Sequence, residues 1–160
     1  METVAILGVG LIGGSFGLAL RNSGLGVRVL GVSSPKTIEK AMEKGAIDGA
    51  VSLEEGVAEA DFILLASPIQ TILDKLPKVL GGAKPEALVT DVGSTKRDIL
   101  ECARKQQGGA LFIGGHPMAG REARGVSAAS DDLFVGRPWF LVPLEQEDLN
   151  IDLGPLGRLI

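Results

Sequence analysis

The chain has 160 residues, of which 45% are apolar, and this length and composition are typical of one globular domain with a single core. Its net charge is −4 with basic and acidic residues interspersed, which argues against a nucleic-acid-binding stripe or a polybasic membrane anchor. No apolar run approaches the roughly 20 residues that span a bilayer, and METVAILGVG lacks the basic region of a signal peptide. A single cysteine, Cys102, cannot form an internal disulfide, so we expect a protein of the reducing cytoplasm.

Short runs rich in Val, Ile and Leu alternate with helical stretches, a pattern typical of βαβ units that build a parallel sheet. The expected strands are residues 4–7, 27–32, 62–66, 88–92, 111–113 and 139–142. Their hydrophobicity is continuous rather than alternating, which indicates strands buried on both faces. The sequence therefore predicts an α/β fold with a doubly wound, mostly parallel sheet.

A glycine-rich turn, GVGLIG, follows the first expected strand and opens an amphipathic helix. In this setting Gly8 permits a tight turn, Gly10 lets the backbone approach a pyrophosphate, and Gly13 allows close packing of helix on strand. The first N–H groups of the helix, around Leu11 and Ile12, would hold the phosphates. The turn predicts a Rossmann-type dinucleotide-binding domain, although a glycine-rich turn that binds nothing stays open.

Helix signals continue along the chain. Ser34 followed by Pro35 predicts a capped helix start, and Ser52 with Glu55 predicts a capping box. The last residues, 154–160, read as the start of a further helix. A doubly wound domain usually continues from such a helix into another strand, so we expect the chain to be a fragment or to lack a partner domain.

The end of the second expected strand bears on the choice of dinucleotide. NAD-binding domains place a carboxylate there for the ribose hydroxyls. This chain has Ser33, Ser34, Lys36 and Thr37 instead, with no carboxylate before Glu39. Serine hydroxyls, a helix N-terminus and a lysine would accept a 2′-phosphate, so the sequence predicts NADP over NAD. The alternative is that these residues form only a turn, a helix cap and a solvated charge.

Further candidate site residues follow the later strands, whose carboxyl ends meet at one edge of an open sheet. Ser67 and Pro68 follow strand 62–66, Ser94 and Lys96 follow strand 88–92, and His116 is expected in a loop after strand 111–113. A histidine with an ordinary pKa near 6.5 can accept a proton at neutral pH, as an alcohol-oxidising dehydrogenase requires. The alternative is a loop histidine that only hydrogen-bonds the backbone.

Four segments in order, GVGLIGGS, ASPIQ, VTDVGSTK and GGHPMAGRE, carry a resemblance that runs over nearly the whole chain. The sequence resembles the nucleotide-binding domain of the prephenate/arogenate dehydrogenase family of tyrosine biosynthesis. The resemblance implies oxidative decarboxylation of prephenate or arogenate without a metal. Hydride passes from the ring carbon bearing the hydroxyl to nicotinamide, the hydroxyl proton goes to His116, and carbon dioxide leaves as the ring becomes aromatic.

The resemblance also implies roles for individual residues. His116 matches the family base, and Ser94 matches a serine that contacts the same substrate hydroxyl. Lys96 and Glu122 match polar positions near the site, but a helix-start charge and a solvated loop residue remain alternatives for them. Arg121 departs from the smaller residue that is common in the family.

The family implies a second, helical domain that supplies a homodimer interface and an arginine for a substrate carboxylate. Residues 1–160 match only the nucleotide-binding domain, so we expect the chain to bind NADP but to turn over slowly or not at all alone. Two alternatives are a reductase of the β-hydroxyacid dehydrogenase type and a non-catalytic NADP-binding module.

Overall fold

A seven-stranded sheet forms the centre of the protein in a computed structural model that describes residues 3–106, 109–145, 153 and 157. The strands are β1 (Thr3–Leu7), β2 (Arg28–Val32), β3 (Gly49–Ala50), β4 (Phe62–Leu65), β5 (Leu88–Asp91), β6 (Leu111–Pro117) and β7 (Trp139–Pro143). Their order is β3-β2-β1-β4-β5-β6-β7, with β1 to β6 parallel and β7 antiparallel to β6. The predicted doubly wound, mostly parallel sheet is confirmed.

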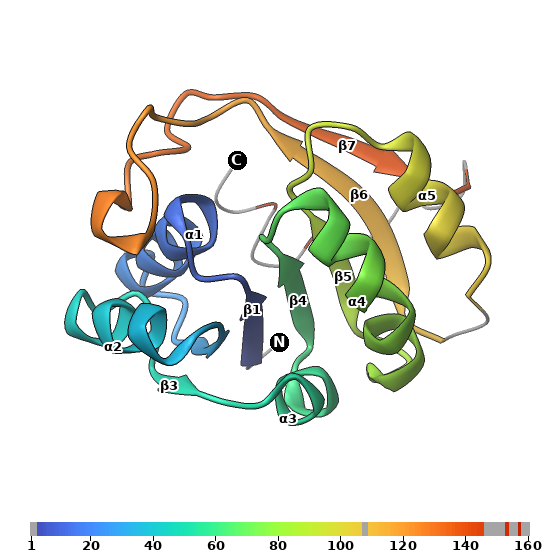
Figure 1. Ribbon diagram of the computed structural model, residues 1–160, viewed down its shortest axis with the longest axis horizontal. Coiled ribbons are helices and arrows are strands. Elements are labelled where there is room, and N and C mark those ends of the chain that lie inside the picture. The colour runs from blue at the N-terminus through green and yellow to red at the C-terminus, as the bar shows by residue number, and fades with distance from the viewer. Residues whose placement is uncertain (1–2, 107–108, 146–152, 154–156, 158–160) are drawn as a thin grey trace.

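Helices cover both faces of this sheet (Figure 1). They are α1 (Leu11–Asn22), α2 (Pro35–Glu43), α3 (Leu53–Glu59), α4 (Ile69–Gly82), α5 (Arg97–Arg104) and the short 3₁₀ helix η1 (Val126–Ala128). Figure 1 shows α1 and α2 at the left of the view and α4 and α5 at the right. Within the described part of the chain, no helix combines the length and hydropathy needed to cross a membrane.

Alternate residues of β1 contribute to two hydrophobic cores, one on each face of the sheet. Val4 and Ile6 pack with residues of α1, α2 and η1, whereas Ala5 and Leu7 pack with residues of α3, α4 and α5. All four side chains are fully buried. Burial on both faces explains the continuous hydrophobic runs from which the strands were predicted.

The predicted helix starts are confirmed. Ser34 is the N-cap of α2 with Pro35 in the first turn, and Ser52 forms a capping box with Glu55 at the start of α3. The helix expected in residues 154–160 falls almost entirely outside the described residues.

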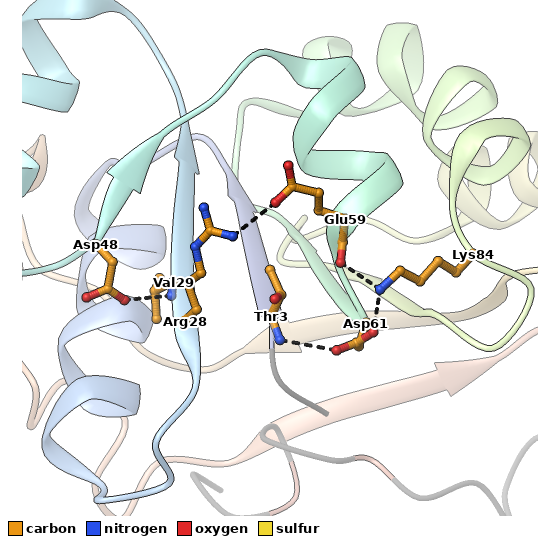
Figure 2. A network of polar contacts seen from close by, with 7 residues as sticks. All are labelled: Thr3, Arg28, Val29, Asp48, Glu59, Asp61 and Lys84. Carbon is orange, nitrogen blue, oxygen red and sulfur yellow. Dashed lines mark hydrogen bonds and ion pairs between the residues drawn. The ribbon is translucent and has the colours of Figure 1, made fainter.

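A polar network crosses the edge of the sheet at which β1, β2 and β4 begin (Figure 2). The Asp61 carboxylate accepts hydrogen bonds from the backbone N–H of Thr3 at 3.1 Å and from the Lys84 ammonium at 2.8 Å. Lys84 also donates to the Glu59 carbonyl at 2.7 Å, and Arg28 donates to the Glu59 carboxylate at 3.1 Å. These contacts join segments at the edge opposite the glycine-rich turn.

One expected strand is wrong in length. Five of the six expected strands agree with the structure to within one residue at each end, but β6 continues to Pro117 rather than ending at residue 113. Antiparallel pairing with β7 extends it, and His116 lies opposite Phe140. His116 is therefore near the end of a strand and not in a loop, because the partner strand supplies the hydrogen bonds that the local sequence does not predict.

Candidate functional site

The glycine-rich turn lies at the carboxyl ends of β1 and β4, where the order of strands in the sheet reverses direction. Gly8 has a φ of +101°, in the left-handed region that favours glycine. A Cβ atom added at Gly8 would lie 2.5 Å from the Ser67 hydroxyl, which donates a hydrogen bond to the Leu7 carbonyl at 3.0 Å. The structure thus brings Ser67 against the turn, at the kind of crevice where open α/β sheets bind ligands.

The other two glycines of the turn have different surroundings. A Cβ atom at Gly13 would lie 2.2 Å from the Gly8 carbonyl oxygen, so this glycine allows α1 to pack closely on the turn. A Cβ atom at Gly10 would meet no atom of the described protein within 4 Å. Gly10 is also the N-cap of α1 and supplies no side chain to its first N–H groups. The start of α1 therefore has no side-chain cap and has open space beside Gly10, a setting that suits a phosphate.

The residues after β2 divide into two groups. The Ser34 hydroxyl accepts a hydrogen bond from the Thr37 backbone N–H at 3.4 Å and lies 2.9 Å from the Thr37 hydroxyl, so both residues serve the α2 cap. Ser33 and Lys36 are exposed. A cavity of about 480 Å³ adjoins this segment, with a lining of Ser33, Pro35, Ile38, Glu39, Ala50, Val51, Ser52 and Glu55.

Two carboxylates line this cavity, those of Glu39 and Glu55. The Glu55 carboxylate accepts hydrogen bonds from the Ser52 backbone N–H at 2.9 Å and from the Ser52 hydroxyl at 2.7 Å. These bonds lower the pKa of Glu55. The Glu55 carboxylate is therefore hydrogen-bonded to Ser52 within the capping box of α3.

A buried ion pair links the end of β5 to the start of α5 and contacts the backbone of β6. Asp91, the last residue of β5, is fully buried and pairs with Lys96, whose side chain is 14% exposed. Lys96 also donates to the Gly115 carbonyl at 2.6 Å. Burial raises the pKa of Asp91 and lowers the pKa of Lys96, while the attraction between the two charges opposes both shifts. Lys96 is therefore more than a solvated charge at a helix start.

The structure brings Ser94 and His116 to the neighbourhood of this ion pair. Ser94 lies between Asp91 and Lys96 in sequence and is exposed, and His116 follows Gly115 directly and is half-buried. Neither side chain forms a hydrogen bond with another of the described residues. Asp91 is a residue that the sequence prediction missed, although its place at a strand end, five residues before a lysine, was a possible signal.

Glu122, a predicted site residue, and its neighbour Arg121 lie farther along the chain. Glu122 is exposed and forms no hydrogen bond or ion pair with the described residues, so the structure does not bring it to the ion pair. The Arg121 guanidinium donates to the Asp132 carboxylate at 3.1 Å, and both residues line a cavity of about 360 Å³.

Pro68 is the N-cap of α4, directly after Ser67.

The segment beyond β6 crosses to the side of the sheet on which α1 lies (orange in Figure 1). Two hydrogen bonds attach it to α1, from the Ser130 backbone N–H to the buried Ser15 hydroxyl at 3.0 Å and from the Asn22 side-chain amide to the Asp131 carboxylate at 2.7 Å. Lys44, just after α2, donates to the Ser127 carbonyl at 2.9 Å. The chain that carries His116 is thus attached to the helix that follows the glycine-rich turn.

Comparison with known proteins gives consistent matches along the chain. Prephenate dehydrogenase of Lactococcus lactis is 39% identical over 150 residues, which are 92% of this chain and 42% of the relative. A crystal structure of Synechocystis arogenate dehydrogenase matches with a TM-score of 0.86 and 38% identity, covering 99% of this chain and 57% of the other. Prephenate dehydrogenase from A. aeolicus, in complex with hydroxyphenyl propionate and NAD⁺, matches with a TM-score of 0.78 and 32% identity, covering 99% and 56%.

The chain thus spans about 42% of the length of its Lactococcus lactis relative. A family model described as prephenate dehydrogenase, nucleotide-binding domain, matches residues 16–153. This match includes α1 from Phe16 onward, the Asp91–Lys96 ion pair and strand β6, which carries His116. The chain belongs to the prephenate dehydrogenase family, of which it represents the nucleotide-binding domain.

Proposed function

We propose that this chain is the cofactor-binding part of an enzyme that oxidatively decarboxylates prephenate or arogenate. The observation that carries the proposal is that His116 and Ser94 lie beside one buried ion pair, at the edge of a sheet whose glycine-rich turn suits a dinucleotide. Neither side chain forms a hydrogen bond with the described residues. Membership of the prephenate dehydrogenase family supports this chemistry over that of other reductases with the same fold.

Residues of the turn would hold a nicotinamide dinucleotide. The open space at Gly10 and the uncapped start of α1 leave room and positive charge for a pyrophosphate. The residues proposed to contact the cofactor here are Gly8, Gly10, Leu11, Ile12, Gly13, Ser67 and Pro68. When bound, the nicotinamide would supply the hydride acceptor for the reaction.

His116 is proposed to act as the general base. Its imidazole accepts the proton of the substrate's ring hydroxyl while hydride leaves the ring carbon that bears this hydroxyl. Ser94 holds the same hydroxyl by a hydrogen bond. The carbon–carbon bond to the ring carboxylate then breaks and carbon dioxide departs. The electron pair of that bond moves into the ring, which becomes aromatic, and the carbonyl oxygen left by hydride loss takes back a proton as a phenol hydroxyl. Lys96 and Glu122 are proposed as weaker contributors to substrate binding, with Lys96 acting from its ion pair with Asp91.

Replacement of His116 by Asn tests this role. We expect turnover to fall by at least about 100-fold, because general acid–base catalysis contributes typically 10²–10⁴-fold. The measurement, made on the enzyme form that turns over, is the absorbance of reduced nicotinamide with NADP and either prephenate or arogenate. Dinucleotide binding measured on the same variant should stay within about twofold, and unchanged turnover would exclude His116 as the base.

We also propose that the cofactor is NADP. No carboxylate follows β2 directly, and Ser33 and Lys36 are exposed beside the start of α2, where they can meet a 2′-phosphate. Ser34 and Thr37, engaged with each other at the cap, would contribute through the N-terminus of α2.

Replacement of Ser33 by Asp tests the cofactor preference. A carboxylate here repels a 2′-phosphate but accepts bonds from ribose hydroxyls, so we expect NADP affinity to fall at least about tenfold while NAD affinity holds or rises. Lys36→Met should weaken NADP binding alone and serves as the matched variant. Equal wild-type dissociation constants for the two cofactors, or tighter binding of NAD, would contradict the proposal.

Turnover is proposed to need more chain than these residues supply. The family relative from Lactococcus lactis is longer, and the match covers 42% of it. We expect the 160 residues to bind NADP and to turn over slowly or not at all without a second, helical domain and its homodimer interface. Robust steady-state activity of the chain alone would contradict this.

A further inference from the structure

Ser94 and His116, which lie on different segments, share one anchoring group. Each directly follows a glycine whose backbone N–H binds the Asp91 carboxylate. The N–H of Gly93 donates to Oδ2 at 2.7 Å, and the N–H of Gly115 donates to Oδ1 at 3.2 Å. A single buried carboxylate thus contacts both segments, one through each oxygen.

Both glycines are packed too closely on Asp91 to carry a side chain. A Cβ atom at Gly93 would lie 2.9 Å from Asp91 Oδ2 and 2.8 Å from Ile99 Cδ1. A Cβ atom at Gly115 would lie 2.3 Å from the Asp91 carbonyl oxygen. The absence of side chains lets the two backbones reach the carboxylate.

Lys96 completes the arrangement. Its ammonium pairs with Asp91 Oδ2 and donates to the Gly115 carbonyl oxygen at 2.6 Å. That carbonyl belongs to the peptide bond joining Gly115 to His116. Gly115 is therefore held through its N–H by Asp91 and through its C=O by Lys96, so the backbone entering His116 is fixed from both sides.

We propose that Asp91 is a positioning residue that sets the spacing between Ser94 and His116 by holding the backbone N–H groups of Gly93 and Gly115. The inference rests on the proposed function, in which these two side chains contact the same substrate hydroxyl. A displacement of about 1 Å between catalytic groups can cost about 100-fold in rate, so such an anchor has a measurable effect on catalysis.

The wild-type protein provides the first test. Amide protons that bind a carboxylate change their NMR chemical shift when it is protonated. The charged and titratable groups near Asp91 are Lys96 and His116, and burial raises the pKa of Asp91 from 3.8. We expect the Gly93 and Gly115 amide protons to titrate together with one midpoint above 3.8. Separate midpoints, or no common transition, would overturn the inference.

The Asp91→Asn variant provides the second test. The two N–H groups bind different carboxylate oxygens, and asparagine replaces one of these oxygens with an NH2 group that cannot accept. One amide therefore loses its partner, and we expect hydrogen exchange at Gly93 or Gly115 to accelerate at least tenfold relative to amides of β4. Thr90→Val is the matched control, because Thr90 is equally buried and its hydroxyl has no hydrogen-bond partner among the described residues. Unchanged exchange in Asp91→Asn would overturn the inference, and the wild-type titration decides it if this variant does not fold.

Kinetics separate positioning from general stability. In the enzyme form that turns over, we expect Asp91→Asn to lower kcat about 100-fold, with the dinucleotide dissociation constant within twofold of wild type. Thr90→Val should retain kcat. Faster hydrogen exchange at Gly93 or Gly115 in Asp91→Asn, together with an unchanged kcat, would overturn the positioning role. A wild-type protein inactive on both substrates would instead contradict the proposed function, and the amide titration would still decide whether Asp91 holds both segments.

Discussion

Two glycines three residues apart in the glycine-rich turn are glycine for different reasons. Gly13 has no room for a Cβ atom, because the Gly8 carbonyl oxygen would lie 2.2 Å away, whereas nothing described approaches a Cβ at Gly10 within 4 Å. Protein packing therefore accounts for Gly13 but not for Gly10. The proposed dinucleotide, passing close to the backbone here, would account for Gly10.

Alanine at each position should separate the fold from the ligand. We expect Gly13→Ala to lower the free energy of unfolding by about 1–3 kcal/mol through overpacking. We expect Gly10→Ala to change it by no more than about 0.5 kcal/mol. Gly10→Ala should nevertheless weaken dinucleotide binding at least about tenfold, measured by titration, because its methyl group occupies the open space. Equal binding by Gly10→Ala and wild type would show that no phosphate approaches this residue.

The capping box matters at the scale of the element because α3 has only seven residues. A helix this short is marginal in isolation and depends on packing and on satisfied terminal N–H groups. Ser52 and Glu55 satisfy two such groups reciprocally, at 3.2 Å and 2.9 Å. The pair thus holds the start of α3 beside the cavity that follows β2.

Glu55→Gln tests the electrostatic part of this cap. The hydrogen bonds from Ser52 lower the pKa of Glu55 below its usual 4.5, so ionised Glu55 stabilises the fold above the unfolded-state pKa. That contribution is lost as the pH falls through the folded-state pKa. Glutamine keeps an acceptor but has no charge. We expect the difference in unfolding free energy, wild type minus variant, to be more positive at pH 7 than at pH 3, measured by urea denaturation. A pH-independent difference would contradict the argument.

Strand β6 shows what local sequence could predict and what it could not. The run from residue 111 to 113 is hydrophobic, but Gly114, Gly115 and Pro117 are poor strand formers, so the pattern predicts an early end. The antiparallel partner β7, more than twenty residues later, decides the real end. Continuous apolar runs, the glycine turn and the helix caps were predictable because their signals are local.

The contacts of the Asp91 carboxylate with two separate segments were not predictable for a related reason. Asp91 and Lys96 are close in sequence, but Gly93 and Gly115 meet the Asp91 carboxylate only because β5 and β6 are neighbours in the sheet. The sequence indicated Ser94, Lys96 and His116 as site residues. It did not indicate the carboxylate beneath them.

At the scale of the whole molecule, the two edges of the sheet differ in composition. The edge with the carboxyl ends of β1, β4 and β5 bears the glycine turn, Ser67 and the ion pair. The opposite edge carries the network of Thr3, Arg28, Glu59, Asp61 and Lys84 (Figure 2). This separation implies that the second edge can be altered without changing ligand binding.

Asp61→Asn tests the separation. The Asp61 carboxylate accepts bonds from the Thr3 N–H and the Lys84 ammonium, and we expect its loss to lower the free energy of unfolding by about 1 kcal/mol. Dinucleotide affinity should stay within about twofold. Arg28→Met removes only an exposed ion pair and should cost about 0.5 kcal/mol or less, so it serves as the control. A large loss of dinucleotide affinity in Asp61→Asn would show that the two edges are coupled.

The outer strands of the sheet bear on association between molecules. At one side β3 has only two residues, and at the other β7 begins after Pro138 and ends at Pro143. Proline has no backbone N–H, and short or proline-bounded outer strands offer few groups for pairing with a strand of another chain. Among the described residues no further strand pairs with β3 or β7. The sheet therefore carries its own protection against edge-to-edge aggregation.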